Sequence, residues 1–555
     1  MPNLRGKKSL ILVLALALIF VGSAVGTATY EYFQDHKKLP PVVSHTDITK
    51  QTMQTFDQSL ATTTPTDIAK YPSTSCAKLS TQWVADENNQ PGVAMTTKDW
   101  RNINLERAEG SALWLNKTSG NCGDTIDIHA SLYGVSTDTF RTGSRTIEAL
   151  RIGWYQGSGA REVWNSGPIK LKEQKIKQPK DSLRMVETTW PTTLKIKLGK
   201  QWVPGFYLFI TRSADGTIEN TAPFVLHSPL GSSKLMVMHS FITWATYNSF
   251  GGRSGYFGAG STKIEMRNDR SRVVSFDRPI VGSGGFSIHR DAVSLVQFLE
   301  QQGISTDQYS DLDLDTWPSI TKSYNGIILG GHPEYFTRRI FETLISARNS
   351  GTNIAILGGN TGIWQVRLNS SKVGTDRRVV IYRNATQDPV SDPQLLSIQF
   401  ADKRINVPQT LLTGTLADGV HVYGNTKAVS IPKWLKIPVN SSINGISPDS
   451  EVEHTVNTAA SPPKVNILFS GIMHYRDTPT IGKPPRPIST LETIWFTTPS
   501  GAAVFNAGVT TWSCDLIKTC AYTTVDEKSR ATMVSVTTQI LHLWETKAVG
   551  KTLTK

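Results

Sequence analysis

The hydrophobic pattern changes its period near residue 230, and this change divides most of the chain into two kinds of fold. Before it, short apolar runs alternate with polar residues at period two, for example over residues 125–130 and 194–198. Alternation over four to eight residues, repeated many times with turn residues between the runs, is typical of antiparallel strands packed in two sheets. We therefore predict an immunoglobulin-like β-sandwich over residues 101–230.

After residue 230 the apolar runs become continuous, at residues 235–239, 325–329 and 353–357. Residues 290–302 and 337–350 lie between these runs and carry apolar side chains at helical spacing. Alternating apolar strands and helices indicate βαβ units and a parallel sheet that is covered on both faces. The sequence predicts an open, mostly parallel α/β domain over residues 231–555, which we expect to resemble class I glutamine amidotransferase-like folds.

Two further parts of this domain can be described from the sequence. Residues 384–500 are rich in Pro, Ser and Asn, and we expect long irregular excursions with short strands there. Residues 526–546 predict a helix, because one stripe of it is apolar. That stripe consists of Met533, Val536, Ile540, Leu541 and Trp544.

One apolar segment is long enough to cross a bilayer. Residues 9–30 carry no charge, and a helix of this length spans about 33 Å. We predict a signal-anchor transmembrane helix over residues 1–30, followed by a polar stalk and lead-in over residues 31–100. A cleaved signal peptide is the alternative, with a small-residue site at residues 24–26. The expected location is the cell membrane, single-pass, with the bulk of the chain extracytoplasmic, or secreted after cleavage.

Cysteine usage agrees with an extracytoplasmic chain. There are four cysteines, none in a C-x-x-C motif, and an oxidising compartment favours disulfides. We predict the pairs Cys76–Cys122 and Cys514–Cys520, because the second pair closes a short local loop. Free buried thiols are the alternative, and the spacings do not suit zinc.

The net charge of +13 is partly concentrated in one stretch. Residues 161–200 hold ten Lys or Arg against four acidic residues, an excess of six positive charges. Such a stretch could bind an anionic cell-envelope polymer or lipid headgroups. A solvated face is the other interpretation, and the expected compartment argues against nucleic acid.

Two predicted strands end in glycine pairs followed by polar side chains. The first runs into His332, Glu334 and Tyr335, and the second runs into Asn360. Ligands bind beyond the carboxyl ends of strands in open α/β sheets, and glycines let a ligand approach the backbone closely. We therefore predict catalytic roles for His332, Glu334 and Asn360. In the alternative interpretation, Thr337 caps a helix after a turn and His332 is merely packed.

A third loop, residues 243–252, follows the first strand of the α/β domain. If that strand lies beside the other two, the loop adds Trp244, Tyr247 and Asn248 to the same crevice as substrate-binding residues. The alternative is an aromatic plug between the two domains. The chain lacks a G-x-S-x-G elbow, an H-E-x-x-H helix and a P-loop.

Several of these segments resemble the large (beta) subunit of N,N-dimethylformamidase and its relatives. In the sandwich they are residues 151–161 and 202–207; in the α/β domain they are residues 246–252, 331–335, 358–360, 499–505 and 508–512. The likeness covers roughly residues 105–520 in a single order.

The resemblance implies an amidohydrolase with one iron ion held by two tyrosines and a glutamate. Hard oxygen ligands suit a ferric ion, which acts as a Lewis acid on an amide carbonyl. Tyr335 looks like one ligand, and His289 stands in the segment where the second ligand is sought. Ser447 occupies the region expected to hold the glutamate, for which Asp449, Glu451 and Glu453 are the alternatives.

Two function hypotheses follow. The first is a membrane-anchored extracytoplasmic protein that hydrolyses an amide or related bond with the help of a metal, and iron is the expected cofactor. The second is a non-catalytic cell-surface module that binds an anionic envelope polymer. Neither the substrate nor the oligomeric state can be inferred from the sequence.

Overall fold

The computed structural model describes residues 79–80, 82–95, 99, 110–133, 142–476 and 488–553. The predicted membrane segment, most of the predicted stalk and Cys76 lie outside these residues. In the part of the chain that is described, no helix is both long enough and apolar enough to span a membrane.

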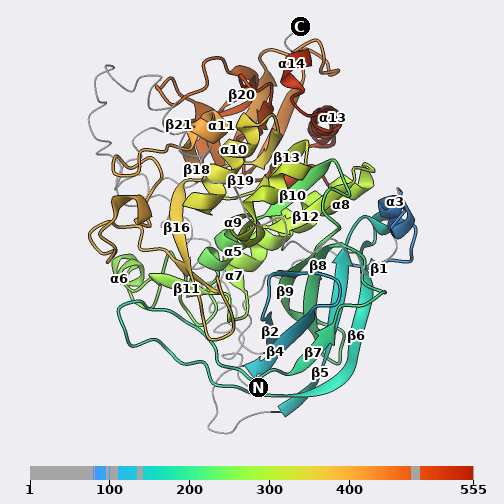
Figure 1. Ribbon diagram of the computed structural model, residues 1–555, viewed down its shortest axis with the longest axis vertical. Coiled ribbons are helices and arrows are strands. Elements are labelled where there is room, and N and C mark those ends of the chain that lie inside the picture. Colours follow the sequence, from blue (N-terminus) through green and yellow to red (C-terminus); the bar gives the residue numbers. More distant parts are fainter. Residues whose placement is uncertain are drawn as a thin grey trace, which may run out of the picture.

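The N-terminal part is built from two sheets that share one apolar core (Figure 1). The larger sheet has the order β1 (Val93–Ala94), β6 (Gly159–Lys172), β5 (Thr142–Ile152), β8 (Gly205–Arg212), β9 (Ile218–Leu226) and β3 (Ser119–Gly120). The smaller sheet has the order β2 (Gly110–Leu115), β4 (Thr125–Tyr133) and β7 (Leu194–Lys197). Alternate residues of β8 face two different cores. Tyr207 and Phe209 pack between the sheets, whereas Phe206 and Leu208 pack against the rest of the protein. The period of two in the sequence therefore arises because successive side chains of a strand point to opposite faces of the sheet.

A nine-stranded sheet forms the centre of the rest of the chain. Its order is β12 (Thr306–Ser310), β10 (Leu235–His239), β13 (Gly326–Gly331), β15 (Asn353–Gly358), β22 (Ala503–Asn506), β21 (Ile488–Thr497), β20 (Asn466–Tyr475), β18 (Thr415–Ala428) and β19 (Ser442–Thr455). The strands from β12 to β22 are parallel, and those from β22 to β19 are antiparallel. The sheet is thus parallel in one half and antiparallel in the other.

Helices cover both faces of the parallel half, as the continuous apolar strands predict. In β13, Ile327 and Leu329 share a core with α10 (Arg338–Asn349), and Ile328 shares another with α8 (Ser294–Gln301) and α13 (Glu527–Trp544). The predicted apolar stripe of the last helix is confirmed, because all five of its side chains are buried. The helix begins where Asp526 accepts a hydrogen bond from the Ser529 backbone N–H at 2.7 Å.

Two expectations differ from the structure. Instead of short strands in irregular excursions, residues 415–497 form the four long strands β18–β21. Their pairing contains several register shifts, for instance between Ala417 and Gly419, which interrupt the period-two pattern. The expected loop at residues 243–252 begins instead as the helix α5 (Phe241–Tyr247), whose residues are all buried. A helix buried on every side has no amphipathic pattern to detect.

The predicted disulfide Cys514–Cys520 is present and joins the short helix α12 (Trp512–Asp515), which contains Cys514, to the turn after it. Cys122 is also disulfide-bonded, but its predicted partner, Cys76, lies outside the described residues. The fold as a whole is mixed α/β, with strands predominating.

Candidate functional site

The central parallel strand β13 leads directly into the first group of candidate residues. At its end, Gly331 has φ +66°, and a Cβ atom there would lie 2.0 Å from the Asp291 carboxyl carbon, so only glycine fits. The chain then passes through His332 and Glu334 into the short strand β14 (Tyr335–Thr337). Thr337 caps α10 by accepting a hydrogen bond from the Ile340 backbone N–H at 3.1 Å, which is the cap that the alternative interpretation predicts.

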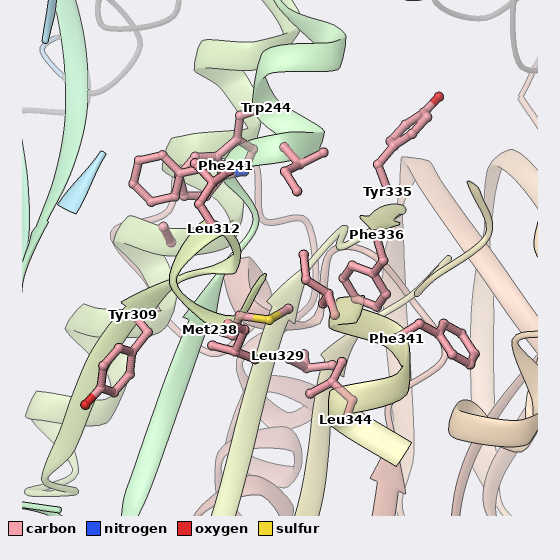
Figure 2. Packing of buried hydrophobic residues seen from close by; sticks show 14 of the residues in the cluster. Met238, Phe241, Trp244, Tyr309, Leu312, Leu329, Tyr335, Phe336, Phe341 and Leu344 are labelled. Atoms are coloured by element: carbon pink, nitrogen blue, oxygen red, sulfur yellow. The ribbon is translucent and has the colours of Figure 1, made fainter. Parts of the chain in front are cut away.

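Tyr335 and its neighbour Phe336 point to opposite sides of β14 (Figure 2). Phe336 turns toward α10, where Phe341 and Leu344 lie. Tyr335 turns the other way, and its hydroxyl lies 2.7 Å from that of Tyr256. The strand alternation thus delivers a phenol to the polar side of the site.

Four oxygen-bearing side chains meet around the Tyr256 hydroxyl, and we call this group the phenol–carboxylate cluster: Tyr247, Tyr256, Glu334 and Tyr335. The Tyr256 oxygen lies 2.8 Å from the Tyr247 oxygen and 2.8 and 3.0 Å from the two Glu334 carboxylate oxygens. Tyr247 also donates a hydrogen bond to Glu334 at 2.7 Å. All four residues are buried, so their mutual contacts take place away from bulk water.

Burial controls the charge of this cluster. It raises the pKa of Glu334, while the neighbouring Arg383 guanidinium and the Tyr247 and Tyr256 hydroxyls act in the opposite direction. Burial, followed by the Glu334 charge, raises the pKa of Tyr247 and Tyr256 well above the ordinary value of a phenol. Both phenols therefore keep their protons at neutral pH and can donate hydrogen bonds to the carboxylate.

His332 lies between two carboxylates. Its Nε2 atom is 3.4 Å from a Glu334 oxygen and 3.5 Å from a Glu451 oxygen, and it has no hydrogen-bond partner among the described residues. Burial, and then the charge of Arg290, lower the pKa of His332 well below its ordinary value. The imidazole is therefore neutral at physiological pH.

Asn360 connects the second glycine-marked strand end to the same place. It follows β15, adopts φ +54°, and donates a hydrogen bond from its side-chain amide to Glu451. Burial, and then the charge of Glu334, raise the pKa of Glu451 to about 7. The strand-end prediction is therefore correct in that His332, Glu334, Tyr335 and Asn360 lie around one centre.

Two predicted substrate-binding residues, Asn248 and Trp244, make contacts outside the phenol–carboxylate cluster. The Asn248 amide donates to the Pro279 carbonyl at 2.8 Å and accepts from the Val281 backbone N–H at 3.1 Å, which are backbone-fixing contacts. Trp244 packs beside Phe241, with ring centroids 4.9 Å apart. Both Trp244 and Asn248 line a hollow between the sandwich and α5.

His289 is buried in the helical segment η3 (Ile288–Val293). Its ring centroid lies 5.5 Å from that of Tyr522. Burial lowers the pKa of His289 to about 3, so the side chain is neutral. The structure pairs this residue with an aromatic ring, and its role as a metal ligand stays a prediction.

The donor chemistry of the cluster suits a hard cation. No group of three or more His, Cys, Asp or Glu that could hold a metal occurs in the described ranges. The phenol–carboxylate cluster is of a different composition, with three phenol oxygens and one carboxylate. Oxygen ligands of this kind suit hard cations such as a ferric ion, so Tyr247, Tyr256, Tyr335 and Glu334 could hold one.

Sequence reasoning missed two residues of the site. Tyr256 lies in an irregular segment after α5, where no period marks it, and Arg383 lies beyond β17 (Arg378–Val380), directly before the stretch expected to be irregular. Glu451 was one of three alternatives for the expected glutamate. An aromatic residue close to a second one, as Tyr256 is to Tyr247, was the one signal that could have pointed to the cluster.

The comparison with protein families covers this whole arrangement. The family model for "N,N-dimethylformamidase beta subunit-like, C-terminal" matches residues 146–523, which include every residue of the phenol–carboxylate cluster and also His332, Asn360 and Glu451. No curated protein matches the chain. Because the family match extends over more than half of the sequence and contains the site, this chain belongs to the N,N-dimethylformamidase beta subunit-like family.

Proposed function

We propose that this protein hydrolyses the C–N bond of small amides. The observation that supports the proposal is the position of neutral His332 between Glu334 and Glu451, at 3.4 and 3.5 Å, beside the phenol–carboxylate cluster. Glu334 accepts hydrogen bonds from two phenols, Tyr247 and Tyr256, whereas Glu451 accepts one from the Asn360 amide. Two carboxylates in different surroundings suit two different roles.

Glu451 is the general base in this proposal. A base works best when its pKa lies near the operating pH, and a pKa of about 7 meets this condition. The Glu451 carboxylate takes a proton from the attacking water, whose oxygen forms the new bond to the amide carbon. The same proton then goes to the departing amine nitrogen as the C–N bond breaks. Asn360 holds the carboxylate in place, and His332 offers a neutral nitrogen beside it.

Glu334 and the tyrosines act on the carbonyl side. If the family's metal is bound, Tyr247, Tyr256, Tyr335 and Glu334 are the residues that would hold it. The cation would supply Lewis-acid polarisation of the amide carbonyl and a lower pKa for a bound water. Without it, the protonated phenols still present hydrogen-bond donors of the kind that stabilise a developing oxyanion.

The test uses the full-length protein and two matched variants. We expect the wild type to release amine from at least one member of a panel of small amides. Glu451→Gln should lower kcat/KM by about 100-fold or more while the metal content is unchanged, because general bases contribute factors of this size. Glu334→Gln should lower both the activity and the metal content.

Glu342→Gln is the control, because Glu342 pairs with Arg338 on the surface of α10 and should not affect either quantity. If the wild type releases no amine from a panel of small amides, the hydrolase proposal is wrong. If Glu451→Gln keeps full activity, the assignment of the base is wrong.

The remaining finer assignments are proposals of the same kind. We propose that the sandwich is immunoglobulin-like and that the parallel half of the large sheet resembles class I glutamine amidotransferase folds, since strand order and helix placement are compatible with both. Membrane anchoring by residues 9–30 also stays a prediction. The alternative of an anionic polymer as partner is less favoured, because Arg161, Arg184 and Lys195 of the basic stretch already pair with carboxylates.

A further inference from the structure

Arg383 lies over the faces of two aromatic rings beside the phenol–carboxylate cluster. Its guanidinium carbon lies 4.4 Å from the centroid of the Tyr256 ring and 4.3 Å from that of the Trp364 ring. Trp364 is itself stacked on Tyr335, with ring centroids 6.5 Å apart and 14° between the planes. Two rings that belong to, or stack on, the cluster therefore fix the position of this cation.

The backbone of Arg383 is in an unfavourable conformation. Its φ of +53° lies in the left-handed region, which costs a non-glycine residue about 1 kcal/mol or more. The conformation is secured by a hydrogen bond from the Arg383 backbone N–H to the Ser397 carbonyl at 2.8 Å. Strained residues of this kind occur often at functional sites, where the side chain is needed in one particular place.

Among the described residues, the guanidinium nitrogens of Arg383 are not engaged by an acceptor. Within the described residues no carboxylate forms an ion pair with them, and no side chain or carbonyl accepts a hydrogen bond from them. Three buried arginines elsewhere in this protein differ. Arg151, Arg290 and Arg377 pair with carboxylates at 2.7, 2.6 and 2.8 Å, respectively.

This contrast indicates what Arg383 can bind. The two rings contact the cation through their π faces and do not take up its N–H donors in the way an oxygen acceptor would, so the hydrogen-bonding capacity at the rim of the planar group is left for another partner. The rim carries N–H donors in a fork that matches the two oxygens of a carboxylate. Arg383 is also only partly buried, so a small anion can reach it more readily than it can reach the buried Glu334.

We propose that Arg383 binds a carboxylate of the substrate, so that the preferred amides are those of small amino or formyl-amino acids and not neutral alkylamides. This inference rests on the proposed hydrolase function and specifies its substrate class. The carboxylate would lie against the guanidinium rim, and the amide carbonyl would face the phenols and Glu334. Arg383 would then be the residue that determines specificity.

A competing explanation is that Arg383 only neutralises Glu334. The Glu334 carboxylate does feel the positive charge of Arg383. That role would make Arg383 equally important for charged and neutral ligands. The two explanations therefore differ in whether its removal affects one class of ligand or both.

The experiment is a binding titration that does not depend on turnover. N-formylglycine and its neutral counterpart N-formylglycinamide differ only in carboxylate against carboxamide. We expect the full-length wild type to bind the carboxylate at least about tenfold more tightly, which corresponds to about 1.4 kcal/mol. Arg383→Met should abolish this preference and leave the affinity for the carboxamide within about twofold.

Two further variants serve as controls. Arg383→Lys keeps the charge but loses the planar fork, so it should retain only part of the preference. Arg404→Met removes a positive charge from an exposed Arg404–Asp402 pair and should leave the preference intact. Circular dichroism of each variant establishes that it is folded.

The outcomes separate this inference from the proposed function. Equal or undetectable binding of both probes to the wild type would overturn it, as would an equal loss of both in a folded Arg383→Met variant. If the carboxylate preference depends on Arg383 but no amine is released from either probe, the hydrolase proposal fails and the anion site stands. If amine is released equally well from both probes, the hydrolase stands and this inference fails.

Discussion

The hydroxyl of Tyr335 lies 2.7 Å from the hydroxyl of Tyr256, a residue 79 positions earlier in the chain. Tyr335 comes from β14, the edge strand of a four-stranded sheet, whereas Tyr256 comes from the irregular segment after α5. The contact therefore joins a strand to a segment without regular structure. The Tyr247 and Glu334 oxygens also approach the Tyr256 oxygen, which lies at the centre of the cluster.

Removal of the Tyr335 hydroxyl tests the contact directly. Tyr335→Phe should lower metal content and amide hydrolysis together, and it should reduce the free energy of unfolding by about 1 kcal/mol, a typical value for one hydrogen bond. Metal analysis, amine release and urea denaturation give the three quantities. Tyr324→Phe is the matched control, because its buried hydroxyl bonds to Tyr309 at 2.6 Å and Asp307 at 2.7 Å. Unchanged metal content and activity in Tyr335→Phe would contradict a role for this phenol.

Two substitutions of Asn360 separate the cost of its backbone conformation from the role of its side-chain amide. Asn360→Gly removes the amide but suits φ +54°, so stability should stay within about 1 kcal/mol of wild type while activity falls. Asn360→Ala removes the same amide and keeps the unfavourable backbone, so it should be less stable than the glycine variant by about 1 kcal/mol. Thermal unfolding and amine release distinguish the two. Full activity in Asn360→Gly would show that the bond to Glu451 is dispensable.

Asp515 predicts a pH dependence of stability. Burial raises its pKa from 3.8 to about 6, with Thr523 donating to it at 2.8 Å. Between these values the native state binds more protons than the unfolded state, so the contribution of this group is complete below pH 4 and is lost as the pH rises through 6. The stability of Asp515→Asn relative to wild type should therefore increase by about 3 kcal/mol from pH 4 to pH 7.

The control variant for this measurement should show the opposite dependence of stability on pH. The pKa of Asp526 is lowered, first of all because its carboxylate accepts a hydrogen bond from the Ser529 backbone N–H. Its stabilising contribution is therefore present above its ordinary pKa and is lost as the pH falls. Asp526→Asn should lose stability relative to wild type as the pH rises from strongly acidic values toward about 4 and should then change no further, so the denaturant titrations extend below pH 4 for this variant. Parallel curves for the two would contradict the assignment.

A buried ion pair connects the sandwich to α8. Arg151 of β5 donates to Glu300 of α8 at 2.7 Å, and both side chains are almost inaccessible. Removal of one partner leaves an uncompensated buried charge, which typically costs about 3–5 kcal/mol. Glu300→Gln should therefore reduce the free energy of unfolding by several kcal/mol, as measured by guanidinium denaturation. Arg151→Met combined with Glu300→Leu removes both charges and should recover most of the loss.

The sequence predicted the regular centre of the α/β fold and the strand ends that carry the site. Strands β10, β13 and β15 are continuous apolar runs because both faces of the sheet are covered, and this pattern is hard to mistake. His332, Glu334, Tyr335 and Asn360 could be predicted to converge, because the carboxyl ends of parallel strands meet at one edge. For these residues, position in the fold follows from position in the strand.

Other parts could not be predicted, for physical reasons. Tyr256 and Arg383 lie in irregular segments, where neither period nor spacing relates a residue to the sheet. The paired strands β18 and β19 were not foreseen, because their register shifts move successive apolar side chains out of alternation. Contacts between such segments depend on the tertiary structure as a whole, which a single sequence does not display.

The position of β22 affects how the protein can be made. Its partner β15 is synthesised about 150 residues earlier, as the hydrogen bond from the Ala503 backbone N–H to the Asn353 side chain shows. Until the ribosome has released that late segment, β15 has an open edge of unpaired backbone N–H and C=O groups that can pair with another chain. We therefore expect chains that end between residues 358 and 503 to aggregate, and expression of the full chain to benefit from chaperones.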